Sequence, residues 1–119
     1  MKTDALLTIN DLKKKIQEFV RARDWEQFHT PKNLSMAIAI EAAELMEEFR
    51  FQTDQEILQN LPTNENVKRE LANITIAILG FCNLYGIDLS SAVTQKLEIN
   101  AKKYPLEKAK GVNKKYTDY

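Results

Sequence analysis

Two groups of acidic and amide side chains stand where the helical pattern of this sequence predicts apolar residues. Glu41, Glu44 and Glu48 lie in one segment, and Glu70 and Asn73 lie in another. On a helical wheel these five side chains fall on or beside the apolar stripes rather than on the polar faces. An ionised carboxylate in an apolar setting is costly unless it is protonated, paired with a base or bound to a cation.

The spacing within each group favours a cation. Glu41 with Glu44, and Glu70 with Asn73, are three residues apart, so each pair shares one face of a helix. Ligand sets made only of oxygen suit Mg²⁺ or Mn²⁺, and the absence of His and Cys from the groups argues against zinc. A single Glu-x-x-Glu is common on solvated helix faces. When two such pairs lie on core-facing stripes, two interpretations have equal weight. One is a metal site, and the other is a set of boundary residues that reach solvent.

Long helices must position these residues. The chain has only three glycines and three prolines, its apolar spacing is helical almost throughout, and no segment alternates as a strand does. The predicted fold class is therefore all-α. We predict a helix from about Ile9 to Arg23, capped by Thr8 and with the apolar stripe Leu12, Ile16, Phe19 and Val20; a helix from about Asn33 to Phe51; a short helix capped by Thr53 that stops before Pro62; a helix capped by Thr63 that ends at Gly86; and a helix capped by Asp88 that ends before Pro105.

Length and charge narrow the class of protein. The 119 residues suffice for one domain, predicted over residues 1–111, with a polar tail over residues 112–119. The part from Leu106 onward is expected to be loose or to lie across a neighbour. Seventeen basic and seventeen acidic side chains balance, which argues against a nucleic acid polymer or an anionic membrane as partner. The lone Cys82, and the lack of a signal-like or membrane-spanning apolar stretch, predict a cytoplasmic protein.

Three stretches of this chain resemble the MazG-like all-α nucleotide pyrophosphohydrolases, closest to their small dCTP-pyrophosphatase-like branch. Glu41-Ala-Ala-Glu44 and the later Glu70-Leu-Ala-Asn73 resemble the family's metal motif, Glu-x-x-Glu followed by Glu-x-x-Asp. Residues 24–34 resemble its N-terminal substrate segment, and residues 96–105 resemble its C-terminal phosphate segment. The three motifs occur in the family's order, and the match covers about residues 23–111.

The resemblance implies a four-helix bundle that forms a homodimer or homotetramer with active sites near the interface. It implies hydrolysis of a nucleoside triphosphate between its α and β phosphates, with Mg²⁺, or Mn²⁺ in its place, as cofactor. The implied metal ligands are Glu41, Glu44, Glu70 and Asn73; Glu44 or Glu48 would orient or deprotonate the attacking water; Trp25 and His29 would bound the base; and Lys96, Asn100 and Lys103 would contact the phosphates, with Tyr104 at the rim.

Position 73 departs from the family pattern, which asks for Asp. Asn73 keeps a carbonyl oxygen for a metal ion, but it lacks the negative charge and cannot accept a proton. We expect an active or weakly active enzyme, and the alternative is a regulatory protein that binds nucleotides without hydrolysing them. A third reading is a structural helical oligomer whose inward Glu side chains pair with Lys across an interface. Without the resemblance, Trp25 is expected in a core, and Lys96 and Lys103 on a solvated face.

Overall fold

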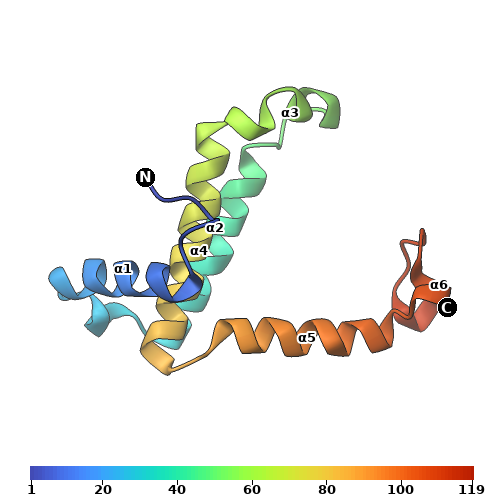
Figure 1. The fold of residues 1–119 in the computed structure, drawn as a ribbon. Helices are drawn as coiled ribbons and strands as arrows, with labels where there is room; N and C mark the ends of the chain where they lie inside the picture. Colours follow the sequence, from blue (N-terminus) through green and yellow to red (C-terminus); the bar gives the residue numbers. More distant parts are fainter. The chain divides into compact units, whose positions relative to one another are not determined.

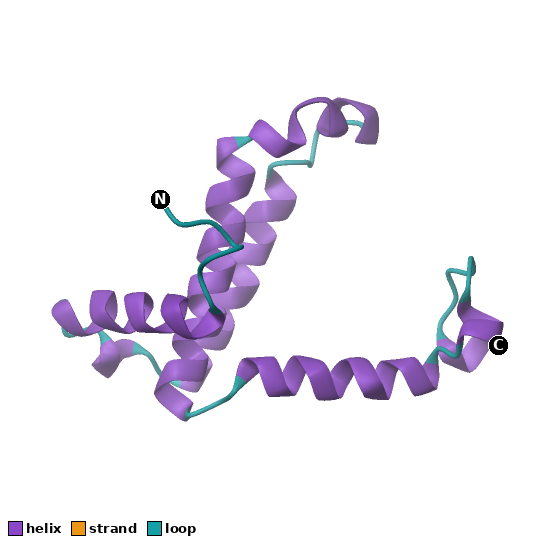
Figure 2. Ribbon diagram, in the orientation of Figure 1, coloured by secondary structure: helices purple, strands orange, loops and turns teal.

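The computed structural model describes residues 1–119 and is entirely helical (Figures 1 and 2). It contains no strand, which confirms the predicted all-α class. No single helix is long and apolar enough to cross a bilayer, and only α4 and α5 taken together as a bent pair have the required length and composition. The helices are α1 (Ile9–Ala22), α2 (Pro31–Glu47), α3 (Asp54–Asn60), α4 (Glu65–Tyr85), α5 (Leu89–Lys103) and α6 (Leu106–Ala109), with 3-10 turns η1 (Glu26–Phe28), η2 (Leu61–Thr63) and η3 (Tyr116–Asp118).

The chain divides into two compact units, Met1–Ile87 and Asp88–Tyr119. The first unit holds α1 to α4, and the second holds α5, α6 and the C-terminal 3-10 turn. The predicted single domain over residues 1–111, with a separate tail, stays a prediction.

Local capping explains where several helices begin and end. Thr8 and Asp11 form a reciprocal capping box, in which the Asp11 amide donates to Thr8 Oγ1 at 3.0 Å and the Thr8 amide donates to Asp11 Oδ2 at 2.9 Å. The Asp88 carboxylate caps α5. Gly86 follows α4 with φ of 65°, a left-handed conformation that glycine adopts without a steric penalty. These three predicted signals are confirmed.

Two helix boundaries differ from the prediction because neighbouring residues form better caps. Helix α2 begins at Pro31, since the Thr30 hydroxyl caps it and proline lacks only an N–H that the first turn would leave unpaired. The N-cap of α4 is Asn64, whose Oδ1 accepts from the amides of Asn66 and Val67 at 3.1 and 3.2 Å. The predicted cap, Thr63, lies in η2 instead.

The C-terminal end of α2 is also earlier than predicted. The helix ends at Glu47, and the residues up to Phe51 form turns instead of the predicted last helical turn. Phe51 is 85% exposed, so burial of its ring does not stabilise a further turn of the helix. Glu48 consequently sits at the C-cap of α2 rather than inside the helix.

The first unit is organised around α4. Helix α2 runs alongside α4, and α1 packs against α4 near its C-terminal half (Figure 1). The few fully buried apolar residues come from these three helices. They are Val20 of α1, Leu34 of α2, and Val67, Leu79 and Cys82 of α4. This pairing of α2 with α4 places the two predicted acidic groups on neighbouring helices.

The second unit is held together by aromatic contacts rather than by a buried core, because none of its helices contains a buried residue. Tyr104, which follows α5, makes edge-to-face contacts with Tyr116 and Tyr119, with ring centroids 5.9 and 6.1 Å apart. The C-terminal residues therefore fold back onto Tyr104. The tail also contains the short helix α6, which the sequence did not predict.

Candidate active site

Three carboxylates from two helices meet in the first unit. Glu41 and Glu44 project from α2 and Glu70 projects from α4, and one carboxylate oxygen of each lies within 4.8 Å of the others. Glu41 and Glu70 are half-buried, and Glu44 is exposed. The Oε2 atoms of Glu41 and Glu70 are buried and have no hydrogen-bond partner in the protein. Two enclosed acceptors without donors are an arrangement that a bound cation would satisfy.

The electrostatics of the cluster reflect this crowding. Burial of the carboxyl raises the pKa of Glu70 above its ordinary value of 4.5, and the neighbouring Glu41 and Glu44 raise it further. No lysine or arginine forms an ion pair with any of the three; the ion pairs of the molecule join other residues. No base of this chain therefore pairs with the cluster, and the alternative of lysine partners across an oligomer interface stays a prediction. Fixed negative charge accumulates here without a counter-charge from the protein.

The remaining predicted members of the acidic site lie at its margins. Asn73, one turn beyond Glu70 on α4, is exposed and lines a pocket together with Glu41. Its carboxamide makes no hydrogen bond within the protein, so its carbonyl oxygen is free to bind a ligand. Glu48, at the C-cap of α2, is half-buried and is not one of the three carboxylates that meet. The role of Asn73 as a metal ligand and the role of Glu48 toward the attacking water therefore stay predictions.

A pocket of about 220 Å³ opens beside the carboxylates, between α1, α2 and α4. Its walls are mostly apolar, and Trp25 and His29 belong to them, as does Phe19 of α1. Trp25 is 43% exposed and contacts Phe19 edge-to-face, with ring centroids 5.7 Å apart. The expectation that Trp25 fills a core is therefore wrong. A mostly apolar pocket with Glu41 and Asn73 at its edge has the composition of a ligand site.

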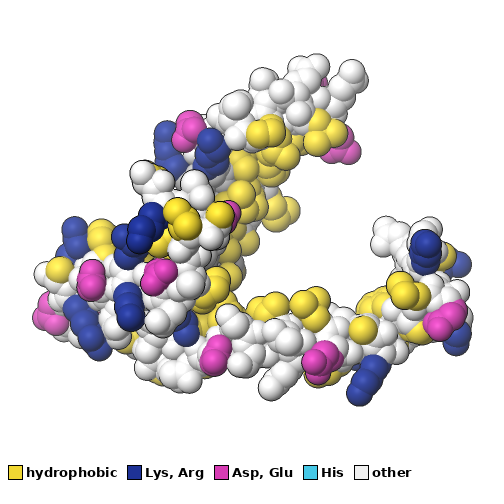
Figure 3. All heavy atoms as spheres, viewed as in Figure 1, with side chains coloured by type: hydrophobic (Ala, Val, Ile, Leu, Met, Phe, Trp, Pro, Cys, Tyr) yellow, Lys and Arg dark blue, Asp and Glu magenta, His cyan; other side chains and the backbone are white.

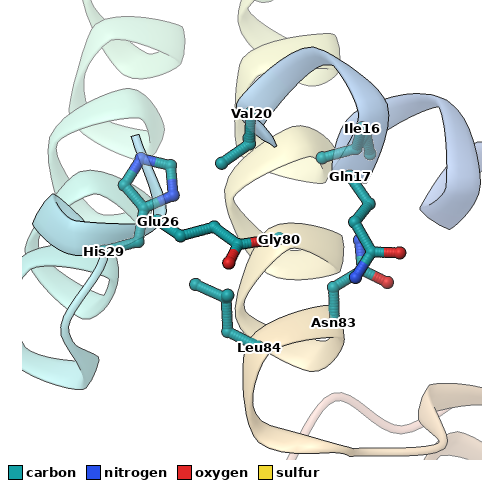
Figure 4. A pocket seen from close by; sticks show the side chains of 8 residues that line it. All are labelled: Ile16, Gln17, Val20, Glu26, His29, Gly80, Asn83 and Leu84. Atoms are coloured by element: carbon teal, nitrogen blue, oxygen red, sulfur yellow. The ribbon is translucent and has the colours of Figure 1, made fainter. Parts of the chain in front are cut away.

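A second and much smaller cavity, of about 10 Å³, is lined by His29 and by residues of α1, η1 and α4 (Figure 4). Its polar lining consists of Gln17, Glu26, His29 and Asn83. Figure 4 shows one ring nitrogen of His29 on the side of the cavity and the other on the far side of the ring. The backbone oxygen of His29 accepts a hydrogen bond from the Tyr85 hydroxyl at 2.8 Å, which anchors the residue to α4.

The predicted phosphate-binding residues belong to the second unit. Lys96, Asn100 and Lys103 recur at spacings of four and three residues, so they share one face of α5. Lys96 and Lys103 are exposed, and Asn100 is half-buried. The Lys103 Nζ lies 5.1 Å from the centre of the Tyr116 ring, within the range of a cation–π contact. Tyr104, the residue proposed for the rim, is the aromatic centre of this unit.

Sequence reasoning missed the part that α1 plays in the pocket. Its stripe Leu12, Ile16, Phe19 and Val20 was expected to enter a core, but only Val20 is fully buried. Ile16 and Phe19 line the pocket instead, and Phe19 is 48% exposed. Glu26 was also missed, although it lines the small cavity together with His29. An apolar stripe has the same sequence pattern whether it faces a core or a pocket, so the sequence carried no signal to separate them.

Comparison with known proteins agrees with this geometry. The sequence model of the MazG-like family matches residues 36–119, which include all three clustered carboxylates and α5. The chain belongs to the MazG-like family. The resemblance to this family is thereby confirmed, and the relatives described next confirm the class of enzyme, a nucleotide pyrophosphohydrolase.

Curated relatives extend the match beyond the region of the family model. The protein named dCTP pyrophosphatase 1 from Homo sapiens is 36% identical over 114 residues, covering 93% of this chain and 67% of that protein. The protein of the same name from Bos taurus is also 36% identical, covering 93% of this chain and 68% of that protein. A crystal structure of a pyrophosphatase from Archaeoglobus fulgidus DSM 4304 has a TM-score of 0.75 and 36% identity, covering 82% of this chain and 92% of that chain.

Proposed function

We propose that this MazG-like chain hydrolyses deoxynucleoside triphosphates to a nucleoside monophosphate and pyrophosphate, with Mg²⁺ as cofactor. The observation that carries the proposal is the meeting of three carboxylates without a basic partner beside a mostly apolar pocket. The leading substrate is dCTP, since relatives that cover most of this chain are named dCTP pyrophosphatase 1. The proposed role is removal of unwanted nucleotides from the cellular pool.

The residues present fit a hard divalent cation. Glu41, Glu44 and Glu70 offer only oxygen, and the buried Oε2 atoms of Glu41 and Glu70 lack any other partner. The carbonyl oxygen of Asn73 is the proposed fourth ligand, and Mn²⁺ suits the same set. When bound, the ion would offset the charge that develops on the phosphate oxygens during the reaction.

The chain's own carboxylates would handle the attacking water. The water oxygen attacks the α-phosphorus, the bond from that phosphorus to the bridging oxygen breaks, and pyrophosphate leaves. A carboxylate that accepts a hydrogen bond from the water orients it and takes its proton. Glu44 and Glu48 are the two proposed candidates, and Glu44 is the one whose carboxylate lies among the clustered oxygens.

The substrate contacts divide between the two units. Trp25 and His29 line the pocket and would bound the base. Lys96 and Lys103, with Asn100 between them on the same face of α5, would contact the phosphates, and Tyr104 would lie at the rim. Hydrogen bonds from a charged donor to a phosphate oxygen are roughly twice as strong as neutral ones, so exposed lysines gain most from an anionic ligand.

We also propose that the working enzyme is a homodimer or homotetramer. Apolar side chains are visible along α2 and α4 and along α5 (Figure 3). The exposed apolar residues of these helices include Met46 of α2 at 71% and Leu97 of α5 at 63% exposure. Exposed apolar surface of this kind is typical of the faces by which subunits associate. Light scattering coupled to gel filtration would test the oligomeric state.

Asn73 supports the alternative function of a weakly active or non-catalytic nucleotide-binding protein. With Asn in place of the family's Asp, the site carries three negative charges rather than four, which weakens its attraction for the cation. This reading predicts that nucleotides raise the melting temperature without being hydrolysed. It also predicts that Asn73→Asp restores hydrolysis.

The deciding experiment measures pyrophosphate release from a panel of ordinary and modified deoxynucleoside triphosphates, with Mg²⁺, with Mn²⁺ and with EDTA. We expect release that depends on the metal and is fastest with dCTP. Release that continues in EDTA would contradict the metal role. No release from any nucleotide, combined with clear nucleotide binding and rescue by Asn73→Asp, would establish the alternative.

A further inference from the structure

Asp24 is the only residue besides glycine whose backbone lies in the left-handed region, with φ of 54°. It follows Arg23, the C-cap of α1, and directly precedes Trp25. A residue with a side chain incurs a steric penalty in this conformation, which Asp and Asn tolerate better than others do. Such strain persists only where the surrounding structure requires it, and it gathers near functional sites. Here it stands directly before a residue that lines the larger pocket.

The hydrogen bonds at the end of α1 show what this conformation achieves. The Asp24 amide donates to the carbonyl of Arg21 at 3.0 Å, and the Trp25 amide donates to the carbonyl of Val20 at 3.1 Å. The two bonds form a Schellman motif, in which a left-handed residue turns the chain back over the last turn of the helix. The position of the Trp25 backbone on α1 therefore depends on the φ and ψ of Asp24.

The same motif brings the Trp25 ring against α1. A Schellman motif is commonly accompanied by an apolar contact between the residue after the left-handed one and the last full turn of the helix. Trp25 makes this contact with Phe19, at 5.7 Å between ring centroids, and both side chains line the pocket of about 220 Å³. The guanidinium carbon of Arg23 lies 3.7 Å from the centre of the Phe19 ring. The left-handed turn thus assembles an aromatic group at the edge of the pocket.

The side chain of Asp24 takes part in holding the turn. Gln27 Nε2, in η1, donates to the Asp24 carbonyl at 3.0 Å and to Asp24 Oδ2 at 3.1 Å. The end of α4 makes a comparable turn with glycine, since Gly86 has φ of 65° and the Ile87 amide donates to the Cys82 carbonyl at 3.0 Å. Glycine ends α4 without strain. At α1, an acidic side chain accepts the strain and ties η1 to the end of the helix.

We propose that Asp24 is a positioning residue for the substrate, because its left-handed backbone holds the Trp25 ring against Phe19 at the edge of the pocket. The inference rests on the proposed function, in which Trp25 bounds the base. Asp24 does not line the pocket and acts through the residue that follows it. A ring held in place before the substrate arrives loses less freedom on binding, which favours affinity. Asp24 thus lowers KM and leaves the rate of the chemical step unchanged.

Three substitutions of Asp24 separate its backbone conformation from its carboxylate. Asp24→Gly permits the left-handed conformation and removes the carboxylate, whereas Asp24→Ala disfavours the conformation and the β-branched Asp24→Val disfavours it most. Trp25 is the only tryptophan, so its fluorescence reports its own surroundings. In EDTA and without nucleotide, we expect the emission of Asp24→Val to shift to longer wavelength and to be quenched more by acrylamide. Asp24→Ala should show a smaller shift, and Asp24→Gly should keep the wild-type emission.

The kinetic arm measures KM and kcat for dCTP with Mg²⁺. The left-handed penalty predicts that KM rises by about 5–30-fold in Asp24→Val, with kcat kept. Asp24→Ala should raise KM less, and Asp24→Gly should stay close to the wild type. Gly86→Ala is the matched control, because it imposes the same penalty at the end of a different helix, where nothing lies within 4 Å of the added Cβ. It should lower the melting temperature and leave both Trp25 emission and KM unchanged.

Wild-type emission and KM in Asp24→Val, in a protein that circular dichroism shows to be folded, would overturn the proposal. If Asp24→Val does not fold, the comparison of Asp24→Ala with Asp24→Gly decides in the same way. A KM raised as much in Asp24→Gly as in the other variants would assign the effect to the carboxylate and reject the role of the backbone.

The failure of this inference and the failure of the proposed function give different results. Shifted Trp25 emission with an unchanged KM would sink the inference and leave the hydrolysis of dCTP standing. Absence of hydrolysis in the wild type would sink the proposed function. Titration of dCTP with Mg²⁺, followed by Trp25 emission, would then give a dissociation constant in place of KM, and the same order of the three variants would decide the role of Asp24.

Discussion

The carboxylate cluster of the first unit and the lysine-bearing face of α5 in the second unit hold charge in opposite ways. In the cluster, Glu41 and Glu70 keep enclosed oxygens that no protein group satisfies, and like charges surround them. On α5, Lys96 is exposed, and Lys103 already has a partner in the Tyr116 ring. The carboxylate cluster is therefore electrostatically unfavourable without a bound cation, whereas the lysine-bearing face of α5 is stable with or without a bound anion.

This difference supports the proposal that the carboxylate cluster carries the chemistry. Groups held in an unfavourable arrangement need no reorganisation when charge develops near them, and such preorganisation usually supplies most of catalysis. Exposed cations supply affinity, because water and salt screen them until an anion binds. Substitutions in the cluster should therefore reduce turnover and raise stability without metal. Substitutions on α5 should reduce substrate affinity and leave stability unchanged.

The largest effect is expected from Glu41→Gln. We expect turnover to fall by about 10²–10³-fold, the usual effect of removing one preorganised electrostatic group. Unfolding in EDTA should become harder, since one of three crowded charges is gone. Glu47→Gln is the matched control, because Glu47 lies on the same helix but pairs with Arg50 at 3.6 Å outside the cluster. Full activity in Glu41→Gln would show that the cluster does not carry the reaction.

Metal binding should stabilise the first unit by a smaller but measurable amount. A cation present at 100 times its dissociation constant contributes about 2.7 kcal/mol to the free energy of unfolding. We expect Mg²⁺ to raise the melting temperature of the wild type and to have little effect on Glu70→Gln. An equal rise in both proteins would mean that the ion binds elsewhere.

On α5, Lys103→Met should raise KM by about tenfold, which corresponds to about 1.4 kcal/mol of binding free energy. We expect kcat to stay close to that of the wild type, and the difference between the two proteins to shrink at high salt. The neighbouring Lys102→Met, which changes a residue on another side of the helix, is the control. A large loss of kcat with KM unchanged would erase the distinction between the two regions.

The smallest effect concerns the pH dependence of stability without metal. Burial and the neighbouring carboxylates raise the pKa of Glu70 in the folded state, so the folded protein binds this proton more tightly than the unfolded chain. The contribution of Glu70 to stability is thus fully present below pH 4.5, its ordinary pKa, and is lost as the pH rises through the raised pKa.

Urea unfolding in EDTA, measured from pH 4.5 to pH 8, tests this sign. We expect Glu70→Gln to be more stable than the wild type at pH 8, with the difference shrinking as the pH falls. The subtraction removes other titrating groups, such as Asp11, whose pKa is lowered by its hydrogen bonds to Thr8. A difference that grows on acidification would show that Glu70 is stabilised as a carboxylate even without metal.

Local features of this fold were readable from the sequence. The caps at Thr8 and Asp88 and the left-handed Gly86 depend on residues within a few positions of one another, so pattern and conformation coincide. The two wrong boundaries, at Thr63 and at Phe51, have different causes. Asn64 accepts two amide hydrogen bonds and so displaces Thr63 as the cap, and the exposed Phe51 ring gives the last turn of α2 nothing to pack against.

By itself, the sequence determined that the chain is helical, where most of its helices begin and end, and that acidic residues stand on apolar stripes. Which of these residues meet depends on how the separate helices pack. Glu41 and Glu70 lie 29 positions apart, and no local rule places their oxygens within 4.8 Å. The same holds for His29, whose enclosed nitrogen exists because α1, η1 and α4 close a cavity around it. Helix formation depends on neighbours in sequence, whereas a site depends on which faces of separate helices pack together.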